Sequence, residues 1–193
     1  TAPRALDYTL AAYAADVAIA HPDDDEPWDL VIGHSLGGAA VTLAAADNPA
    51  WTRRLVLIDP GLRITDGERD AVRSSQDEAF MDVTVEDVRR DNPRWHEQDL
   101  ELKALSSRQV SRWAVAETDI QNPDWDARAA AAALRIPTHI IGADPAVFSI
   151  FTADLAAEVC TNPHITMSVV ENAGHSPHRD RPDETLRQLF AAL

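Results

Sequence analysis

Four short apolar runs, separated by segments with helical spacing, constrain the fold of this chain more than any other feature. They cover residues 30–33, 55–58, 138–141 and 165–170. The second run, Leu-Val-Leu-Ile, is apolar at every position, which is typical of a parallel strand covered on both faces. Strands that alternate with helices build an α/β fold, because right-handed crossovers place helices on both faces of the sheet. We therefore predict a mostly parallel sheet with helices on both faces.

The first run leads directly into Gly33-His34-Ser35-Leu36-Gly37, and an Ala-rich helical segment follows. A G-x-S-x-G pattern between a strand and a helix is typical of a sharp turn that exposes a serine at the sheet edge. Its two glycines leave room for neighbouring backbone where a side chain would clash. The N–H of Leu36 and the helix dipole then face a developing oxyanion. The pattern predicts Ser35 as a nucleophile and Leu36 as an oxyanion-hole donor.

Polar residues also follow the other three runs, in the order Asp59, Asp144 and His175. Ligands of an open α/β sheet bind beyond the carboxyl ends of its strands, so these residues are candidates for one site. A serine hydroxyl needs a base within hydrogen-bond reach, and the base needs an orienting partner. His175 is the predicted base because its loop directly follows the last run, and His178 is its competitor.

The orienting carboxylate has two candidates. Asp59 and Asp144 each follow a predicted strand and precede a proline, a position that is also typical of an aspartate that only caps a turn. We favour Asp144 as the acid, since the order Ser…Asp…His is the usual one for this kind of serine turn. Asp59 stays the alternative acid.

Together, these segments resemble the α/β-hydrolase family. The matching residues are 33–38, the strand 55–58 with Asp59, the segment 136–144 and residues 172–175. The resemblance implies that Ser35 is the nucleophile, Asp144 the acid and His175 the base, with Leu36 supplying one oxyanion-hole N–H. Many members have one or two more residues between the glycine and the acid than the segment Gly142-Ala143-Asp144 has. Asp59 therefore stays the alternative acid.

The resemblance also implies a division of the chain. Residues 62–128 are charged and helical, with helices expected near 66–80, 84–91, 98–118 and 124–134. They correspond to the family's helical cap, whereas residues 1–61 and 129–193 correspond to the C-terminal part of the hydrolase core. In the family, the serine turn follows the fifth strand, but here it follows the first predicted one. We therefore expect the neighbouring strands and a second oxyanion donor to precede Thr1, and this chain alone to be weakly active or inactive.

Composition excludes several classes of partner. The net charge of −15 argues against nucleic acid and anionic membrane surfaces. No run is long and apolar enough for a transmembrane helix, no signal peptide begins the sequence, and Cys160 is the single cysteine. We expect a cytoplasmic protein.

No H-x-x-x-H or carboxylate–histidine cluster indicates a metal, and we expect no cofactor. The predicted function is a serine hydrolase that cleaves a small carboxylic ester or related acyl substrate through an acyl-enzyme. The alternative is a non-catalytic, hydrolase-like binding module or an inactive fragment.

Overall fold

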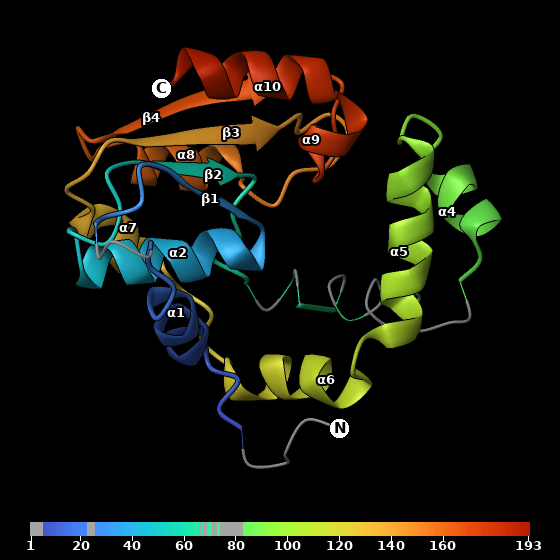
Figure 1. Cartoon of the computed structure of the whole chain (residues 1–193), viewed down its shortest axis with the longest axis horizontal. Helices are drawn as coiled ribbons and strands as arrows, with labels where there is room; N and C mark the ends of the chain where they lie inside the picture. The colour runs from blue at the N-terminus through green and yellow to red at the C-terminus, as the bar shows by residue number, and fades with distance from the viewer. Residues whose placement is uncertain (1–5, 23–25, 66, 68, 71–72, 74–82) are drawn as a thin grey trace. The chain divides into compact units, whose positions relative to one another are not determined.

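The chain forms two compact units. The computed structural model describes residues 6–22, 26–65, 67, 69–70, 73 and 83–193 (Figure 1). Residues 10–63 and 125–193 make up the larger unit, which we call the core unit. Residues 1–9 and 64–124 make up the smaller one, which we call the helical unit.

A four-stranded parallel sheet organises the core unit. Its strands are β1 (Val31–His34), β2 (Leu55–Ile58), β3 (Thr138–Ala143) and β4 (Ile165–Val170), and they lie in the order β1-β2-β3-β4. All neighbours pair in parallel, with Gly33 opposite Leu57 and Ile58 opposite Ile141. The four carboxyl ends therefore meet at one edge of the sheet, and the predicted α/β class is confirmed.

Helices lie on both sides of this sheet, as Figure 1 shows for α2, α7 and α8 on one side and α10 on the other. The core-unit helices are α1 (Leu10–Ala18), α2 (Leu36–Asp47), α7 (Arg128–Ala133), α8 (Ala153–Val159), α9 (Pro177–Asp180) and α10 (Pro182–Ala191). Every residue of β2 is buried, as expected for a strand covered on both faces.

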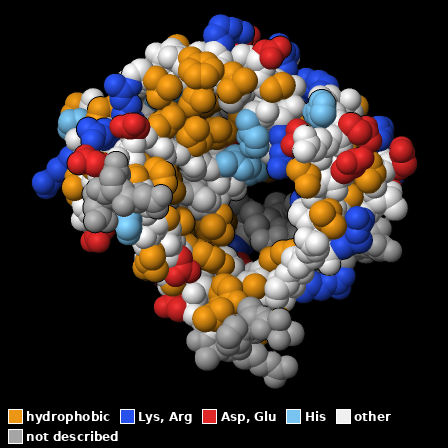
Figure 2. All heavy atoms as spheres, in the orientation of Figure 1, with side chains coloured by type: hydrophobic (Ala, Val, Ile, Leu, Met, Phe, Trp, Pro, Cys, Tyr) orange, Lys and Arg blue, Asp and Glu red, His pale blue; other side chains and the backbone are white. Residues whose placement is uncertain are grey.

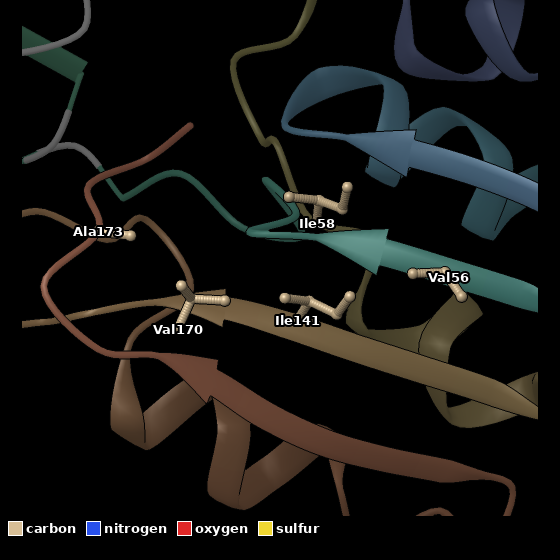
Figure 3. Close-up of a cluster of buried hydrophobic side chains, with 5 residues drawn as sticks. All are labelled: Val56, Ile58, Ile141, Val170 and Ala173. Atoms are coloured by element: carbon tan, nitrogen blue, oxygen red, sulfur yellow. The ribbon is translucent and has the colours of Figure 1, made fainter. Parts of the chain in front are cut away.

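A buried apolar cluster connects the strands on one face of the sheet. It consists of Val56, Ile58, Ile141, Val170 and Ala173. Figure 3 shows the first four on β2, β3 and β4, whereas Ala173 lies beyond the end of β4. Leu189 of α10 packs against the cluster. Full burial of each large apolar side chain contributes roughly 1.5–3 kcal/mol, so this packing fixes the ends of the strands relative to one another.

The helical unit contains α4 (Val85–Asp91), α5 (Glu97–Gln109) and α6 (Arg112–Gln121). Its apolar contacts include Val88, Leu100 and Ala104. The sequence predicted one helix over residues 98–118, but the backbone is extended at Val110, and Ser111 caps a new helix by accepting the N–H of Ala114. The helix expected over 66–80 lies largely outside the described residues. The assignment of residues 62–128 as a cap stays a prediction.

Candidate active site

The serine turn joins β1 directly to α2. Ser35 adopts a positive φ of 54°, and its N–H donates to the carbonyl of Ile58 on the neighbouring strand. A Cβ at Gly33 would lie 2.5 Å from Val41 Cγ2 and 2.8 Å from the carbonyl oxygen of Gly37. Position 33 therefore accepts only glycine without a shift of its neighbours. At Gly37 a Cβ would meet no atom within 4 Å, so the expected crowding applies to one of the two glycines of the pattern.

A continuous hydrogen-bonded chain runs from this serine through His175 to a carboxylate. His175 Nε2 lies 2.9 Å from Ser35 Oγ. On the other side of the ring, His175 Nδ1 lies 2.7 Å from Asp59 Oδ2. A nucleophile, a base and an orienting acid require this order of contacts. Three segments that are distant in sequence thus converge at the carboxyl edge of the sheet.

Asp59 follows β2 and is completely buried, with 0% of its side chain exposed. Besides His175, its carboxylate accepts hydrogen bonds from the N–H of Ala143 at 3.2 Å, Ser149 Oγ at 2.6 Å and the N–H of Ile150 at 3.1 Å. Burial works to raise the pKa of Asp59, but the hydrogen bonds from His175, Ser149 and Ile150 outweigh it and hold the pKa below 3.8. Asp59 is therefore held as an anion beside the imidazole ring.

The favoured acid, Asp144, lies elsewhere. Its two carboxylate oxygens accept the backbone N–H groups of Ala146 and Asn172, both at 2.8 Å. These hydrogen bonds lower its pKa, and they close the loops that follow β3 and β4. In the structure, the contact to His175 is made by Asp59 and not by Asp144. Asp59, the alternative acid, contacts His175, whereas the carboxylate of Asp144 accepts hydrogen bonds from backbone N–H groups.

Leu36, the predicted oxyanion donor, is the first residue of α2. The first N–H groups of a helix have no acceptor within the helix, so the N–H of Leu36 points out of the N-terminal end of α2.

Among the described residues there is no group of three or more His, Cys, Asp or Glu side chains that could hold a metal ion. No helix in the part of the chain that the structure describes has the length and apolar character needed to cross a membrane.

Comparison with known proteins identifies the family. The model of the Alpha/beta hydrolase family matches residues 1–188. The chain belongs to this family. A comparison with curated proteins finds no match.

Solved structures of hydrolases share the fold of this α/β-hydrolase. The N-formylmaleamic acid deformylase from Pseudomonas putida is 25% identical, with a TM-score of 0.75 over 96% of this chain and 74% of its own. E-2-(acetamidomethylene)succinate hydrolase is 22% identical, with a TM-score of 0.82 over 99% of this chain and 75% of its own. An esterase from Exiguobacterium antarcticum is 15% identical, with a TM-score of 0.73 over 96% of this chain and 74% of its own.

Two residues of the α/β-hydrolase site were not singled out from the sequence as functional. His34 Nε2 lies 2.7 Å from the carbonyl oxygen of His175, and Ser149 contacts Asp59. Burial is the largest of the causes that lower the pKa of His34 to about 4, so at neutral pH this ring is neutral. The position of His34 next to Ser35 could have indicated a functional role from the sequence. Nothing in the sequence marks a loop serine such as Ser149 as functional.

The rings of His34, His175 and His178 gather at this edge of the sheet. The ring centroid of His34 lies 4.7 Å from that of His175 and 4.8 Å from that of His178. Figure 2 shows histidine side chains grouped on the drawn face, beside a hydrophobic area. The ring that contacts Ser35 is that of His175, and the competing His178 lies against His34 instead.

The loop that carries His175 is fixed at several points. Asn172 adopts a positive φ of 59°, and its N–H donates to Asp144. The N–H of Gly174 donates to Asp180 Oδ2 at 2.6 Å. With the contact from His34, these hydrogen bonds hold the loop on both sides of the imidazole. Asp144 therefore orders this loop without touching the ring.

Proposed function

We propose that this chain is a serine hydrolase that cleaves small carboxylic esters or related acyl compounds through an acyl-enzyme. The observation that carries the proposal is the chain of contacts from Ser35 through His175 to Asp59, at 2.9 Å and 2.7 Å. Family membership and the hydrolases that share the fold support the same reaction class.

In the proposed reaction, Ser35 Oγ attacks the carbonyl carbon of the substrate while His175 Nε2 accepts its proton. The N–H of Leu36, at the positive end of the dipole of α2, donates to the oxyanion. His175 then returns the proton to the leaving group, and an acyl group remains on Ser35. A water molecule, deprotonated by His175, releases the acid and restores the serine.

Asp59 is the proposed acid of this mechanism. Its contact to Nδ1 leaves Nε2 of His175 without a proton, ready to accept one from Ser35. The buried negative charge also stabilises the imidazolium that forms when the serine attacks. Asp144 has no part in this mechanism other than its hydrogen bond to the loop of His175.

The names of the structural neighbours indicate acyl chemistry in several forms. They include a deformylase, an acetamidomethylene succinate hydrolase, an esterase and an enzyme that degrades N-acyl homoserine lactone. For this chain, we propose an acyl substrate without choosing among ester, thioester and lactone, because the three triad residues serve all of them.

A fluorophosphonate probe tests the proposal, since it reacts only with an activated serine. Labelling of the wild-type chain at Ser35, located by peptide mass spectrometry and abolished in Ser35→Ala, is the expected result. Ser168→Ala, which removes a serine hydroxyl of β4, is the matched control and is labelled normally. An unlabelled wild-type chain that is folded and does not turn over p-nitrophenyl esters would instead favour a binding module.

A further inference from the structure

We infer that Ser149 is a positioning residue whose hydroxyl orients the Asp59 carboxylate toward His175. The inference rests on the proposed function, because it concerns the acid of that mechanism. Ser149 lies in the loop between β3 and α8, and it is five residues beyond the aspartate that the sequence favoured.

The direction of the Ser149 hydroxyl follows from its neighbours. Ser149 Oγ accepts the N–H of Phe151 at 3.2 Å, and Phe151 is buried with 2% exposure, so this contact anchors the oxygen. The hydroxyl has a single proton to donate. Its closest acceptor is Asp59 Oδ1 at 2.6 Å, while the carbonyl of Phe151 lies at 3.2 Å. A hydroxyl donates preferentially to a carboxylate at such a distance.

The two oxygens of Asp59 receive separate sets of donors. Oδ1 accepts Ser149 Oγ and the N–H of Ala143, whereas Oδ2 accepts His175 Nδ1 and the N–H of Ile150. Because Ser149 donates to Oδ1, rotation of the Asp59 carboxylate about its Cβ–Cγ bond would break this contact. Oδ2 is thereby kept facing the imidazole.

Of these donors, Ser149 is the one that a substitution can remove without touching the backbone or the imidazole. Ala143 and Ile150 donate through their main-chain N–H groups, which every variant except proline retains. The side chain of Asp59 has no exposure to solvent, so water does not readily replace a lost donor. Truncation of Ser149 therefore removes the side-chain donor to Asp59, together with the acceptor of the Phe151 N–H.

The test compares Ser149→Ala with the wild-type chain, and Ser149→Thr with Ser149→Val, a pair of almost equal volume that differs in the hydroxyl. Ser168→Ala is the control, because its hydroxyl contacts His139 and Gln188 rather than the triad. The first measurement is the rate of fluorophosphonate labelling at Ser35. The second is the low-field proton NMR signal of His175 Nδ1–H, which needs no activity.

We expect Ser149→Ala and Ser149→Val to be labelled about tenfold more slowly or worse, as for loss of a hydrogen bond to a charged group. Their low-field proton signal should broaden or disappear. Ser149→Thr and Ser168→Ala should keep the signal and label at nearly the wild-type rate.

Wild-type labelling and signal in Ser149→Ala, or equal behaviour of the Thr and Val variants, would overturn the inference. If Ser149→Ala does not fold, the Thr and Val pair decides. If the wild-type chain is not labelled, the proposed function fails, and the NMR comparison still decides the role of Ser149.

Discussion

At the scale of single residues, the site depends on one buried negative charge. Asp59 has no exposed side-chain surface, yet four donors surround its carboxylate. An anion in this environment is stable only while its hydrogen bonds are complete, because a buried charge without partners is costly. One of the four contacts, from His175 Nδ1, ties the imidazole to this carboxylate.

Asp59→Asn is expected to reduce fluorophosphonate labelling by about 10³–10⁴-fold, because an amide no longer holds the right tautomer of His175. Asp144→Asn is the matched comparison at the carboxylate that the sequence favoured. It should retain labelling within about tenfold and lose ~1 kcal/mol of stability through its turn contacts. Labelling rates and urea unfolding measure both effects. The assignment of the acid fails if Asp144→Asn abolishes labelling and Asp59→Asn does not.

His34 predicts a pH dependence of stability. The pKa of its ring is lowered from 6.5 to about 4, mainly by burial, so between these values the unfolded chain binds a proton that the folded chain does not. Stability therefore falls as the pH decreases through this window, by on the order of 3 kcal/mol or less. His34→Gln keeps an N–H for the carbonyl of His175 and removes this titration.

Urea unfolding of wild type and His34→Gln at about pH 7 and about pH 4.5 measures this difference. The variant should lose less stability than the wild type on going to the lower pH. His21→Gln, at an exposed position, is the control. An equal loss in His34→Gln and wild type would contradict a buried neutral ring.

At the scale of elements, the junction of β1 and α2 depends on close backbone packing. The Cβ of an alanine at position 33 would overlap Val41, and it would also overlap main-chain atoms of Gly37 and Gly38. Overlap with main-chain atoms cannot be relieved by a change of rotamer. A shift of the turn would move Ser35 away from His175.

Gly33→Ala is expected to destabilise the chain by about 1–3 kcal/mol and to lower labelling of Ser35. Gly37→Ala is the matched variant of the same pattern, in open space inside α2. It should be as stable as the wild type or gain about 0.5–1 kcal/mol from the better helix former. Thermal unfolding and labelling of both variants measure this contrast. Equal destabilisation by both substitutions would show that crowding at Gly33 is not the constraint.

At the scale of the whole molecule, the core unit brings together residues that are more than a hundred positions apart. His175 is 140 residues from Ser35 and 116 from Asp59. Strand register produces this convergence, because the parallel strands end at one edge. The hydrolase structures that share the fold match almost all of this chain and about three quarters of their own length.

An acyl-enzyme predicts a burst of product before steady turnover. With a p-nitrophenyl ester whose deacylation is slow, the first phase should release about one equivalent of p-nitrophenol for each active site. Stopped-flow absorbance measures the burst, and Ser35→Ala should lack it. Turnover without a burst, and without a trapped acyl group on Ser35 by mass spectrometry, would contradict the mechanism.

Much of this architecture followed from local patterns. The four apolar runs predicted the strands within a few residues, and the glycine–serine pattern predicted the turn between β1 and α2. The break between α5 and α6 was missed, because Val110 and Ser111 do not interrupt the helical composition around them. Capping by Ser111 became evident only from its hydrogen bond to Ala114.

The sequence by itself determined the strands, the serine turn and the histidine loop, since each depends on residues close together in the chain. The order Ser…Asp…His, on which Asp144 was favoured, does not separate the two aspartates, because Asp59 also follows a strand and satisfies the same order. Only the tertiary structure decided which carboxylate meets His175. Backbone donors next to Asp144 satisfy its oxygens, whereas Asp59 is enclosed by Ser149, the main chain and the imidazole. Such a choice depends on side-chain hydrogen bonds across the sheet edge, which no local pattern encodes.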